Sequence, residues 1–273
     1  MSKPRVTYRP RIAPAAVLLT VLLFFGSGSA HADRRYFVRS YTPYLAPAGE
    51  LELETWLTAR SGRQDSTVHT AWNQRVEFEY AQTDRLTLAG LLNFTQEPGG
   101  SLTFVSPAIE VIYGLAERGR VFGDPAFYTE VSESGEEMEI ENKLLLAHRS
   151  GRLVSAVNLI SEIEIRHNDE EKLPTGETLS NHFSGEITGG VAYEVSPMVA
   201  IALEGRYRTE HPNFGSQAAA IFSLGPTVNF QSGKVQLAIG SLVQVWGNPH
   251  TRGRRNLEDF EKMQVRAILG IEL

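Results

Sequence analysis

The fold of this chain is decided by its last stretch, KMQVRAILGIEL at residues 262–273. Every second residue from Met263 to Leu273 is apolar, and the residues between them are polar or small except for Ile268. Side chains on a strand alternate between two faces, so this pattern predicts an amphipathic strand. A soluble sheet could place such a strand at its edge. A membrane barrel needs one, because its last strand must pair with its first and leave no open edge.

The first 32 residues have the three parts of an export signal. Four basic residues between positions 3 and 11 precede an apolar run at residues 12–25, and Ala30-His31-Ala32 fits a small-residue cleavage site. The apolar run is shorter than the roughly 20 residues that a spanning helix needs, which favours a cleaved signal over a membrane anchor. Residues 1–32 are therefore predicted to be a signal peptide that is cleaved after Ala32.

Composition supports export and argues against several kinds of function. The chain has no cysteine, which excludes disulfides, thiolate metal sites and a lipoprotein anchor. Without the four basic residues of the signal, 22 basic and 32 acidic residues remain, so nucleic-acid binding is not expected. No later apolar run approaches the length of a membrane-spanning helix.

Residues 33–49 are predicted to be an irregular lead-in, because Pro43, Pro47 and Gly49 interrupt a segment rich in aromatic residues. From residue 50 onward, apolar and polar side chains alternate with the period of strands and not of helices. Strands are expected at residues 50–59, 72–81, 86–95, 103–114, 124–132, 138–148, 153–166, 180–195, 198–209, 218–230, 234–246 and 262–273. Residues 50–273 are therefore predicted to form a single barrel domain.

The connections between these strands differ in length in a regular way. Those at residues 82–85, 149–152, 196–197 and 231–233 are short, whereas those at 60–71, 167–179, 210–217 and 247–261 are long and polar. Outer-membrane barrels have this asymmetry, with short periplasmic turns and longer outer loops. Residues 115–123 are an exception, because they are long where a short inner turn is expected.

These patterns predict an all-β fold, a transmembrane antiparallel up-and-down β-barrel of about 12 strands in the bacterial outer membrane. The soluble alternative is a β-sandwich or a lipocalin-like barrel with its apolar face inward. The polar faces argue against this alternative, because they carry Glu and Arg but little Lys, and solvent-facing strands commonly use Lys.

Four short patterns in the first third of the chain are YF at residues 36–37, PAGELE at 47–52, VEFEY at 76–80 and TDR at 83–85. Together they resemble the opening of proteobacterial outer-membrane barrel proteins of unknown function. The resemblance implies an outer-membrane location. A barrel in that membrane is expected to contact outer-membrane lipid and to be recognised by the barrel-assembly machinery through its C-terminal strand. It brings no assigned activity, and Leu273 stands where such barrels more often end in Phe.

If the apolar faces of the strands meet lipid, their polar faces must line the lumen. The predicted lumen-lining residues are Glu52, Glu54, Arg75, Glu77, Glu79, Glu162, Glu164, Arg166, Glu186, Glu204, Arg206, Arg208, Arg266 and Glu272. Both a salt-bridged plug and a narrow polar pore are consistent with this set, because about twelve strands enclose a lumen of intermediate size. No long loop is expected to fold inward as a constriction.

The charges are expected to be sorted along the lumen. Counted from their predicted inner ends, Glu162, Glu186 and Arg206 stand at similar heights on consecutive strands, so Arg206 is expected between the two carboxylates. Lower down, five carboxylates of the first two strands and the last strand gather with no arginine at their level. An acidic ring favours cations, so a conducting lumen is expected to be mildly cation-selective.

The chain is therefore interpreted as a narrow porin-like channel, or a binder for small polar or cationic solutes. Two alternatives remain open, a membrane-embedded lipid hydrolase and a structural or adhesive barrel that acts through its outer loops. A hydrolase needs a serine within reach of a histidine, and His182 and Ser184 supply these residue types. Their spacing of two already places them on one face, so we expect an ordinary polar pair and no catalytic residue.

Four histidines lie in or beside the predicted outer loops and could converge on a transition metal: His69, His167, His211 and His250. None of them stands in a metal-binding spacing such as H-x-x-H or H-E-x-x-H. Exposed polar loop residues are the simpler interpretation, and neither a metal ion nor a cofactor is expected.

Overall fold

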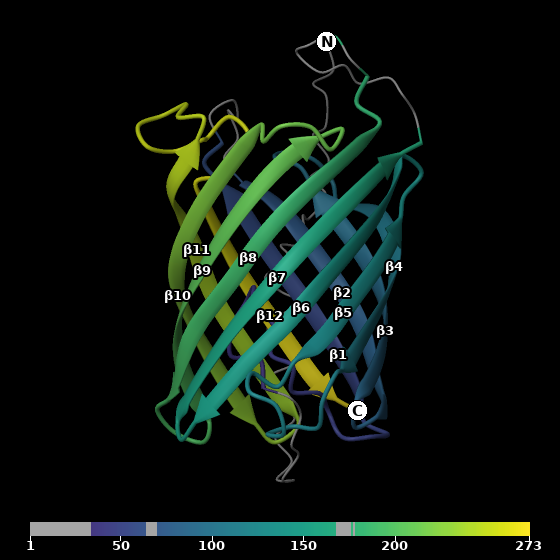
Figure 1. Ribbon diagram of the computed structural model, residues 1–273, viewed down its shortest axis with the longest axis vertical. Coiled ribbons are helices and arrows are strands. Elements are labelled where there is room, and N and C mark those ends of the chain that lie inside the picture. The colour runs from purple at the N-terminus through teal and green to yellow at the C-terminus, as the bar shows by residue number, and fades with distance from the viewer. Residues whose placement is uncertain (1–33, 64–69, 168–175, 177) are drawn as a thin grey trace, which may run out of the picture.

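The structure is a computed structural model that describes residues 34–63, 70–167, 176 and 178–273. Its strands form a closed barrel in which each strand pairs antiparallel with the next and β12 returns to β1 (Figure 1). The strands are β1 (Leu51–Ser61), β2 (Thr70–Thr83), β3 (Leu86–Gln96), β4 (Thr103–Gly114), β5 (Ala126–Glu133), β6 (Glu137–Ser150), β7 (Leu153–Arg166), β8 (Asn181–Glu194), β9 (Val199–Pro212), β10 (Ala219–Ser232), β11 (Val235–Asn248) and β12 (Met263–Glu272). The predicted all-β barrel of twelve strands is thus confirmed.

The predicted signal peptide, residues 1–32, lies outside the described residues. So do residue 33, residues 64–69 and 168–175 of two long loops, and residue 177. In the described part of the chain, no helix has the length and apolar character needed to cross a membrane.

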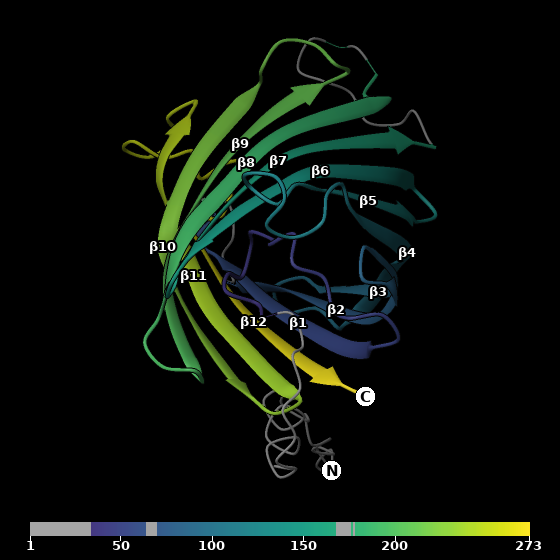
Figure 2. The same ribbon diagram turned by 60° about the horizontal axis from the view of Figure 1, so that its bottom comes forward.

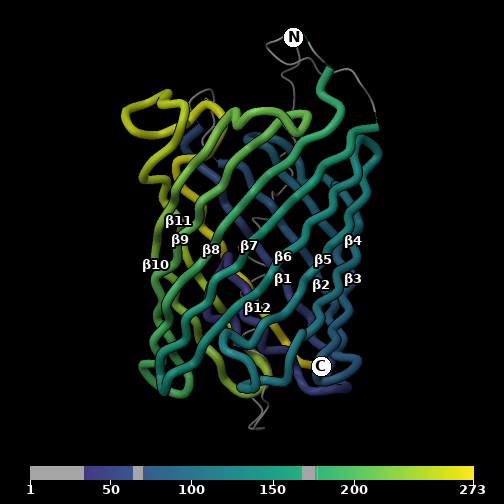
Figure 3. Tube along the Cα trace, in the orientation of Figure 1, coloured from purple at the N-terminus to yellow at the C-terminus, as the bar shows by residue number. Residues whose placement is uncertain are grey.

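The last strand closes the ring as its alternating pattern predicts. β12 pairs with β1 from Glu52 opposite Glu272 to Ser61 opposite Met263, and the backbone N–H of Leu273 donates to Leu51 O at 2.8 Å. The strands are strongly tilted against the long axis of the barrel (Figure 3). Because both sides of every strand are paired, the barrel leaves no strand edge open.

The outer surface of the barrel is apolar. Ile109, Leu203 and Phe78 expose 68%, 54% and 50% of their surface, and they belong to a large set of exposed apolar residues distributed over the strands. A continuous apolar surface of this kind is unfavourable in water and is what contact with lipid requires.

The two ends of the barrel differ. At the short-turn end, tight connections join β2 to β3, β6 to β7, β8 to β9 and β10 to β11, and the C-terminus lies there as well (Figure 1). The connections β1–β2, β7–β8 and β11–β12 at the opposite, long-loop end are longer. Residues 115–125, between β4 and β5, are the long connection at the short-turn end that the sequence indicated.

Residues 34–45, here called the plug segment, enter the lumen as an irregular loop (Figure 2). Most of their side chains are buried, including Tyr36, Phe37, Val38, Tyr41 and Tyr44. The prediction that this segment is irregular is confirmed, but the sequence did not predict its position inside the barrel. The lumen is therefore occupied by the chain's own N-terminal part.

The expectation that no long loop folds inward is wrong. The connection between β11 and β12 buries Asn256, Leu257 and Phe260 at the long-loop end. Phe260 packs against Ile221, and the side-chain amide of Gln244 donates to Asn256 O at 3.0 Å. Because Ile221 and Gln244 turn toward the inside of the barrel, this loop narrows its mouth next to β10 and β11.

Candidate functional site in the lumen

All the predicted lumen residues stand at strand positions whose side chains turn inward. These residues are Glu52, Glu54, Arg75, Glu77, Glu79, Glu162, Glu164, Arg166, Glu186, Glu204, Arg206, Arg208, Arg266 and Glu272. They lie on six strands, and several of them contact the plug segment. The lumen is thus charged along its length, and arginines of the plug segment form ion pairs with its carboxylates.

Small wall residues make room for the plug segment. A Cβ atom added to Gly190 would lie 2.6 Å from a ring carbon of Phe37, and one added to Gly240 would lie 2.7 Å from Cγ2 of Val38. Four alanines of neighbouring strands complete the seat of the aromatic residues: Ala147, Ala156, Ala192 and Ala200. At both glycines, a larger side chain would take up space that the plug segment fills.

A second apolar cluster holds the middle of the plug segment. Val38 and Tyr41 pack with Trp56, Tyr128 and Ile268 in a group whose members are at most 6% exposed. Ile268 is the residue that interrupts the polar face of the last strand in the sequence. Its side chain points inward like those of its polar neighbours, and it packs in the same cluster as Val38 and Tyr41 of the plug segment.

The backbone of the plug segment is bonded to the wall through side chains. The carboxylate of Glu204 accepts three consecutive N–H groups, those of residues 38–40, with the first two at 3.3 and 3.0 Å. The side-chain amide of Asn158 accepts the N–H of Tyr41 at 2.7 Å and donates to its carbonyl at 2.9 Å. Since Glu204 and Asn158 are fully buried, these bonds replace the water that both side chains would otherwise need.

An ion pair ties the plug segment to β8, and two arginines of β9 join the same group of charges. The guanidinium of Arg39 binds both oxygens of Glu186 at 3.0 and 3.2 Å, and Arg206 binds the same carboxylate at 2.7 Å. Glu162 pairs with Arg208 at 2.7 Å, and Arg208 also lies 3.6 Å from Glu186. The prediction that Arg206 would bridge the two carboxylates is therefore wrong, because the register places Arg208, and not Arg206, opposite Glu186.

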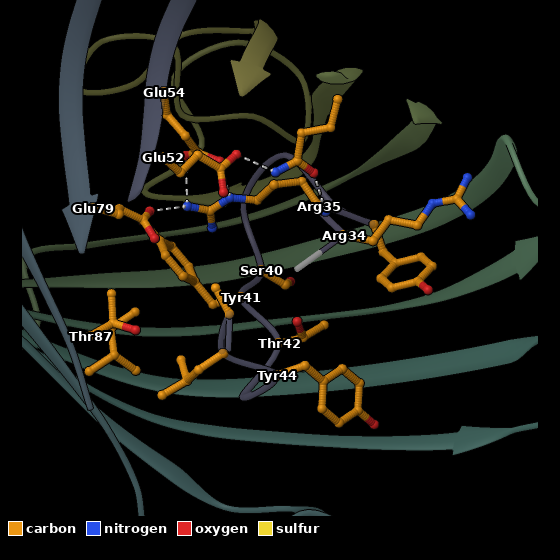
Figure 4. A pocket seen from close by; sticks show the side chains of 15 residues that line it. Arg34, Arg35, Ser40, Tyr41, Thr42, Tyr44, Glu52, Glu54, Glu79 and Thr87 are labelled. Carbon is orange, nitrogen blue, oxygen red and sulfur yellow. Dashed lines mark hydrogen bonds and ion pairs between the residues drawn. The ribbon is translucent and has the colours of Figure 1, made fainter. Parts of the chain in front are cut away.

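Near the short-turn end, the carboxylates of β1, β2 and β12 gather as predicted, but an arginine stands among them. Arg35 of the plug segment donates to both oxygens of Glu54, at 3.0 and 2.9 Å, and reaches Glu79 at 3.4 Å (Figure 4). The cavity left between them is about 30 Å³, room for one or two waters. The expectation of an acidic level without arginine is wrong, because the cation comes from outside the strands.

At the short-turn mouth, Tyr36 donates its hydroxyl to Glu194 at 2.6 Å. Burial and this hydrogen bond raise the pKa of the Tyr36 phenol, so the hydroxyl keeps its proton. Arg149 binds Glu194 at 3.0 Å, and Arg34 donates to Pro197 O at 3.1 Å. The plug segment is therefore fixed both at the mouth and at the middle of the strands.

The described part of the chain contains one cluster of possible metal ligands. Glu54, Glu77 and Glu79 form the only group of three or more His, Cys, Asp or Glu whose ligand atoms lie within 4.8 Å of one another there. The guanidinium of Arg35 already provides a cation at this group. Of the histidines predicted in or beside loops, His167 contacts Glu133 at 2.7 Å, and His69 lies outside the described residues. His211 and His250 contact the backbone carbonyls of Gly215 and Gly247.

The lipid-hydrolase alternative can be compared with the geometry at Ser184. Its hydroxyl donates to Glu210 at 2.6 Å, and Nε2 of His182 contacts the same carboxylate oxygen at 2.5 Å. Arg208 also donates to the Ser184 hydroxyl, at 2.7 Å. A serine nucleophile needs a hydrogen bond to its base, whereas here both side chains converge on Glu210. The geometry is that of a polar wall network.

A larger cavity of about 290 Å³ lies on the long-loop side of the plug segment. Its basic lining residues are Arg39, Arg75, Lys143 and Arg266, and its acidic ones are Glu130, Glu139, Glu141 and Glu162. Tyr41 and Trp56 form part of its lining. This cavity is the larger of the two described here, and a small solute could be held in it.

Several lumen residues were missed from the sequence: Glu110, Glu130, Glu139, Glu141, Lys143, Asn158 and Glu210. A signal existed for β6, because Glu137, Glu139, Glu141 and Lys143 alternate with Met138, Ile140 and Asn142. For the plug segment the signal was its aromatic content, since four aromatic rings within residues 36–44 need burial somewhere.

A closed twelve-stranded ring with an apolar outer surface and a charged lumen is the fold of a porin-like outer-membrane β-barrel. The fold is similar to that of the COG4313 outer membrane channel from Pseudomonas putida F1, with a TM-score of 0.56 and 14% identity, covering 87% of this chain and 100% of that one. It is also similar to the NanC porin, with a TM-score of 0.52 and 11% identity, covering 81% of this chain and 98% of that one.

The chain belongs to a family of unknown function (DUF6662), which matches residues 103–273. The resemblance to outer-membrane barrels of unknown function is thus confirmed. No curated protein matches the sequence.

Proposed function

We propose that this protein is a narrow outer-membrane channel for small polar solutes, and that the plug segment closes it. The observation that carries the proposal is the seating of residues 34–45 in a charged lumen. The segment fills the short-turn half of the lumen, where the cavity beside Arg35 measures only about 30 Å³. The long-loop half keeps a cavity of about 290 Å³. The closed state therefore has a solute-sized chamber on one side of the plug segment and a filled lumen on the other.

The contacts of the plug segment with the strands are reversible. It is held by hydrogen bonds, ion pairs and apolar contacts, and it enters from the short-turn end, where residues 46–49 lead into β1. Four of the wall groups that hold it are polar: Glu54, Glu186, Glu204 and Asn158. They would be hydrated if the segment left, so the open lumen would be a wet, polar path.

Opening would also change the charge of the lumen. The plug segment carries Arg34, Arg35 and Arg39, which pair with Glu194, Glu54 and Glu186 in the closed state. Without these three cations, the level of Glu54, Glu77 and Glu79 would be strongly acidic. An acidic ring attracts cations and repels anions, so the open channel should prefer cations.

In this proposal the barrel sits in the bacterial outer membrane, with its apolar surface in lipid and its long loops outside the cell. The short-turn end and the entrance of the plug segment then face the periplasm. The barrel-assembly machinery would recognise β12.

The proposal is tested by recording currents through the purified, folded protein in planar bilayers. Wild type should be closed most of the time, with brief conducting events that are mildly cation-selective in a salt gradient. Glu77→Gln combined with Glu79→Gln should move the reversal potential toward zero. Glu164→Gln is the control, because it removes a lumen carboxylate that lies outside this acidic level. A folded protein that never conducts would refute the proposal, and anion selectivity would refute its charge argument.

A further inference from the structure

The 290 Å³ cavity has a basic and an acidic side chain on opposite walls, neither of which is in a described ion pair. Arg266 lies on β12 and Glu139 on β6, and both line the cavity. In the closed ring these strands are six places apart in either direction, so they face each other across the lumen. Strands about 4.8 Å apart and tilted by about 40° put the opposite walls of such a ring on the order of 24 Å apart. A gap of several atoms therefore separates the two charged groups.

Arg266 presents a positive charge that no carboxylate of the described chain neutralises. Its Nε donates to Thr58 Oγ1 at 2.8 Å and its Nη1 to Val38 O at 3.0 Å, so both partners are uncharged. The guanidinium carbon lies 5.0 Å from the centre of the Trp56 ring, which also lines the cavity. These contacts fix the guanidinium in place without satisfying its charge.

Glu139 is the acidic group on the opposite wall. Its neighbours at the cavity are paired, Glu141 with Lys143 at 2.7 Å and Glu162 with Arg208 at 2.7 Å. In the described chain, no basic side chain pairs with Glu139 itself. Its partner across the β6–β7 ladder is Glu164, a second carboxylate, which strengthens the negative field on this wall.

We propose that this cavity binds a small zwitterionic solute whose carboxylate contacts Arg266 and whose ammonium group contacts Glu139. The inference rests on the proposed channel function and names the class of solute that the chamber would accept. The volume, near the lower end of ligand pockets, fits a small linear molecule and not a large one. A solute with one charge would satisfy one wall and leave the other unpaired, so the two charges together provide the selectivity.

The binding of three linear compounds with six-carbon chains tests the proposal. 6-Aminohexanoate carries both charges, hexanoate only the negative one and hexylammonium only the positive one. Isothermal titration calorimetry on the folded protein in detergent should show 6-aminohexanoate binding at least tenfold more tightly than either of the others. The plug segment stays in place in this measurement, because the cavity lies on its long-loop side.

Variants separate the two walls. Arg266→Gln should remove the advantage of 6-aminohexanoate over hexylammonium, and Glu139→Gln should remove its advantage over hexanoate. Glu117→Gln should leave all three affinities within about twofold, because Glu117 lies in the β4–β5 connection at the short-turn end and does not line the cavity. Equal affinity for the three compounds in the wild type, or no effect of either cavity variant, would overturn the inference. Because bilayer currents are measured separately, conduction without zwitterion binding would refute this inference alone, and binding without conduction would refute the channel.

Discussion

Glu204→Ala should release the plug segment, because this carboxylate holds three consecutive backbone N–H groups of the segment. Hydrogen bonds to a charged group contribute about 1.5–3 kcal/mol each, and part of this is regained from water once the segment is released. A net loss of about 3 kcal/mol is therefore reasonable for the set. At 1.4 kcal/mol for each factor of ten, the ratio of released to seated plug should rise by roughly 100-fold.

Single-channel recording measures this ratio as the open probability of the channel. Glu164→Ala is the matched control, because it removes an inward carboxylate of β7 that makes no contact with residues 34–45 among the contacts described. Heat-modifiable migration on gels should show that both variants are closed barrels. If folded Glu204→Ala has the open probability of the wild type, the plug segment does not control conduction and the reasoning fails.

Two further predictions concern the membrane. Leu203→Arg places a charge on the apolar outer surface, where Leu203 is 54% exposed, and it should lower the free energy of unfolding from lipid vesicles by about 2–4 kcal/mol in urea titrations. Leu203→Val is the control, and an unchanged value for the arginine variant would contradict the lipid-facing assignment. Because the chain has no native cysteine, single cysteines report orientation directly. Ser216→Cys should react with an impermeant maleimide on intact cells and Ser196→Cys only after the outer membrane is broken, and the opposite result would reverse the proposed orientation.

The strands could be predicted because a barrel strand repeats its pattern every two residues. That alternation assigns each side chain to the lipid or to the lumen without any knowledge of the neighbouring strands. For this reason the twelve strands and the inward direction of residues such as Glu77 and Arg208 followed from the sequence. Even Ile268, the exception in the last strand, kept the inward direction that its position dictates.

Pairing inside the lumen could not be predicted, because it depends on the offset between strands. Heights counted along each strand suggested Arg206 as the bridge between Glu162 and Glu186, whereas the register sets Arg208 opposite Glu186. The plug segment escaped prediction for a different reason. An irregular segment has no periodic pattern from which its position can be predicted. Its place in the lumen depends on the space that Gly190 and Gly240 leave in the barrel wall and on the need to bury its own aromatic side chains.

The central claim is that residues 34–45 close a conducting lumen, and one tether tests it most directly. A Cβ atom at residue 240 would lie 2.7 Å from Cγ2 of Val38 and still closer to Oγ1 of Thr227, so a disulfide between cysteines at positions 38 and 240 also needs Thr227→Ala to make room for it. The variant Val38→Cys, Gly240→Cys and Thr227→Ala should be silent in a planar bilayer while oxidised, and should begin to conduct in the same bilayer when a reductant is added. Thr227→Ala alone is the control for the added space. Currents that are the same before and after reduction, in protein shown to carry the disulfide, would contradict the account.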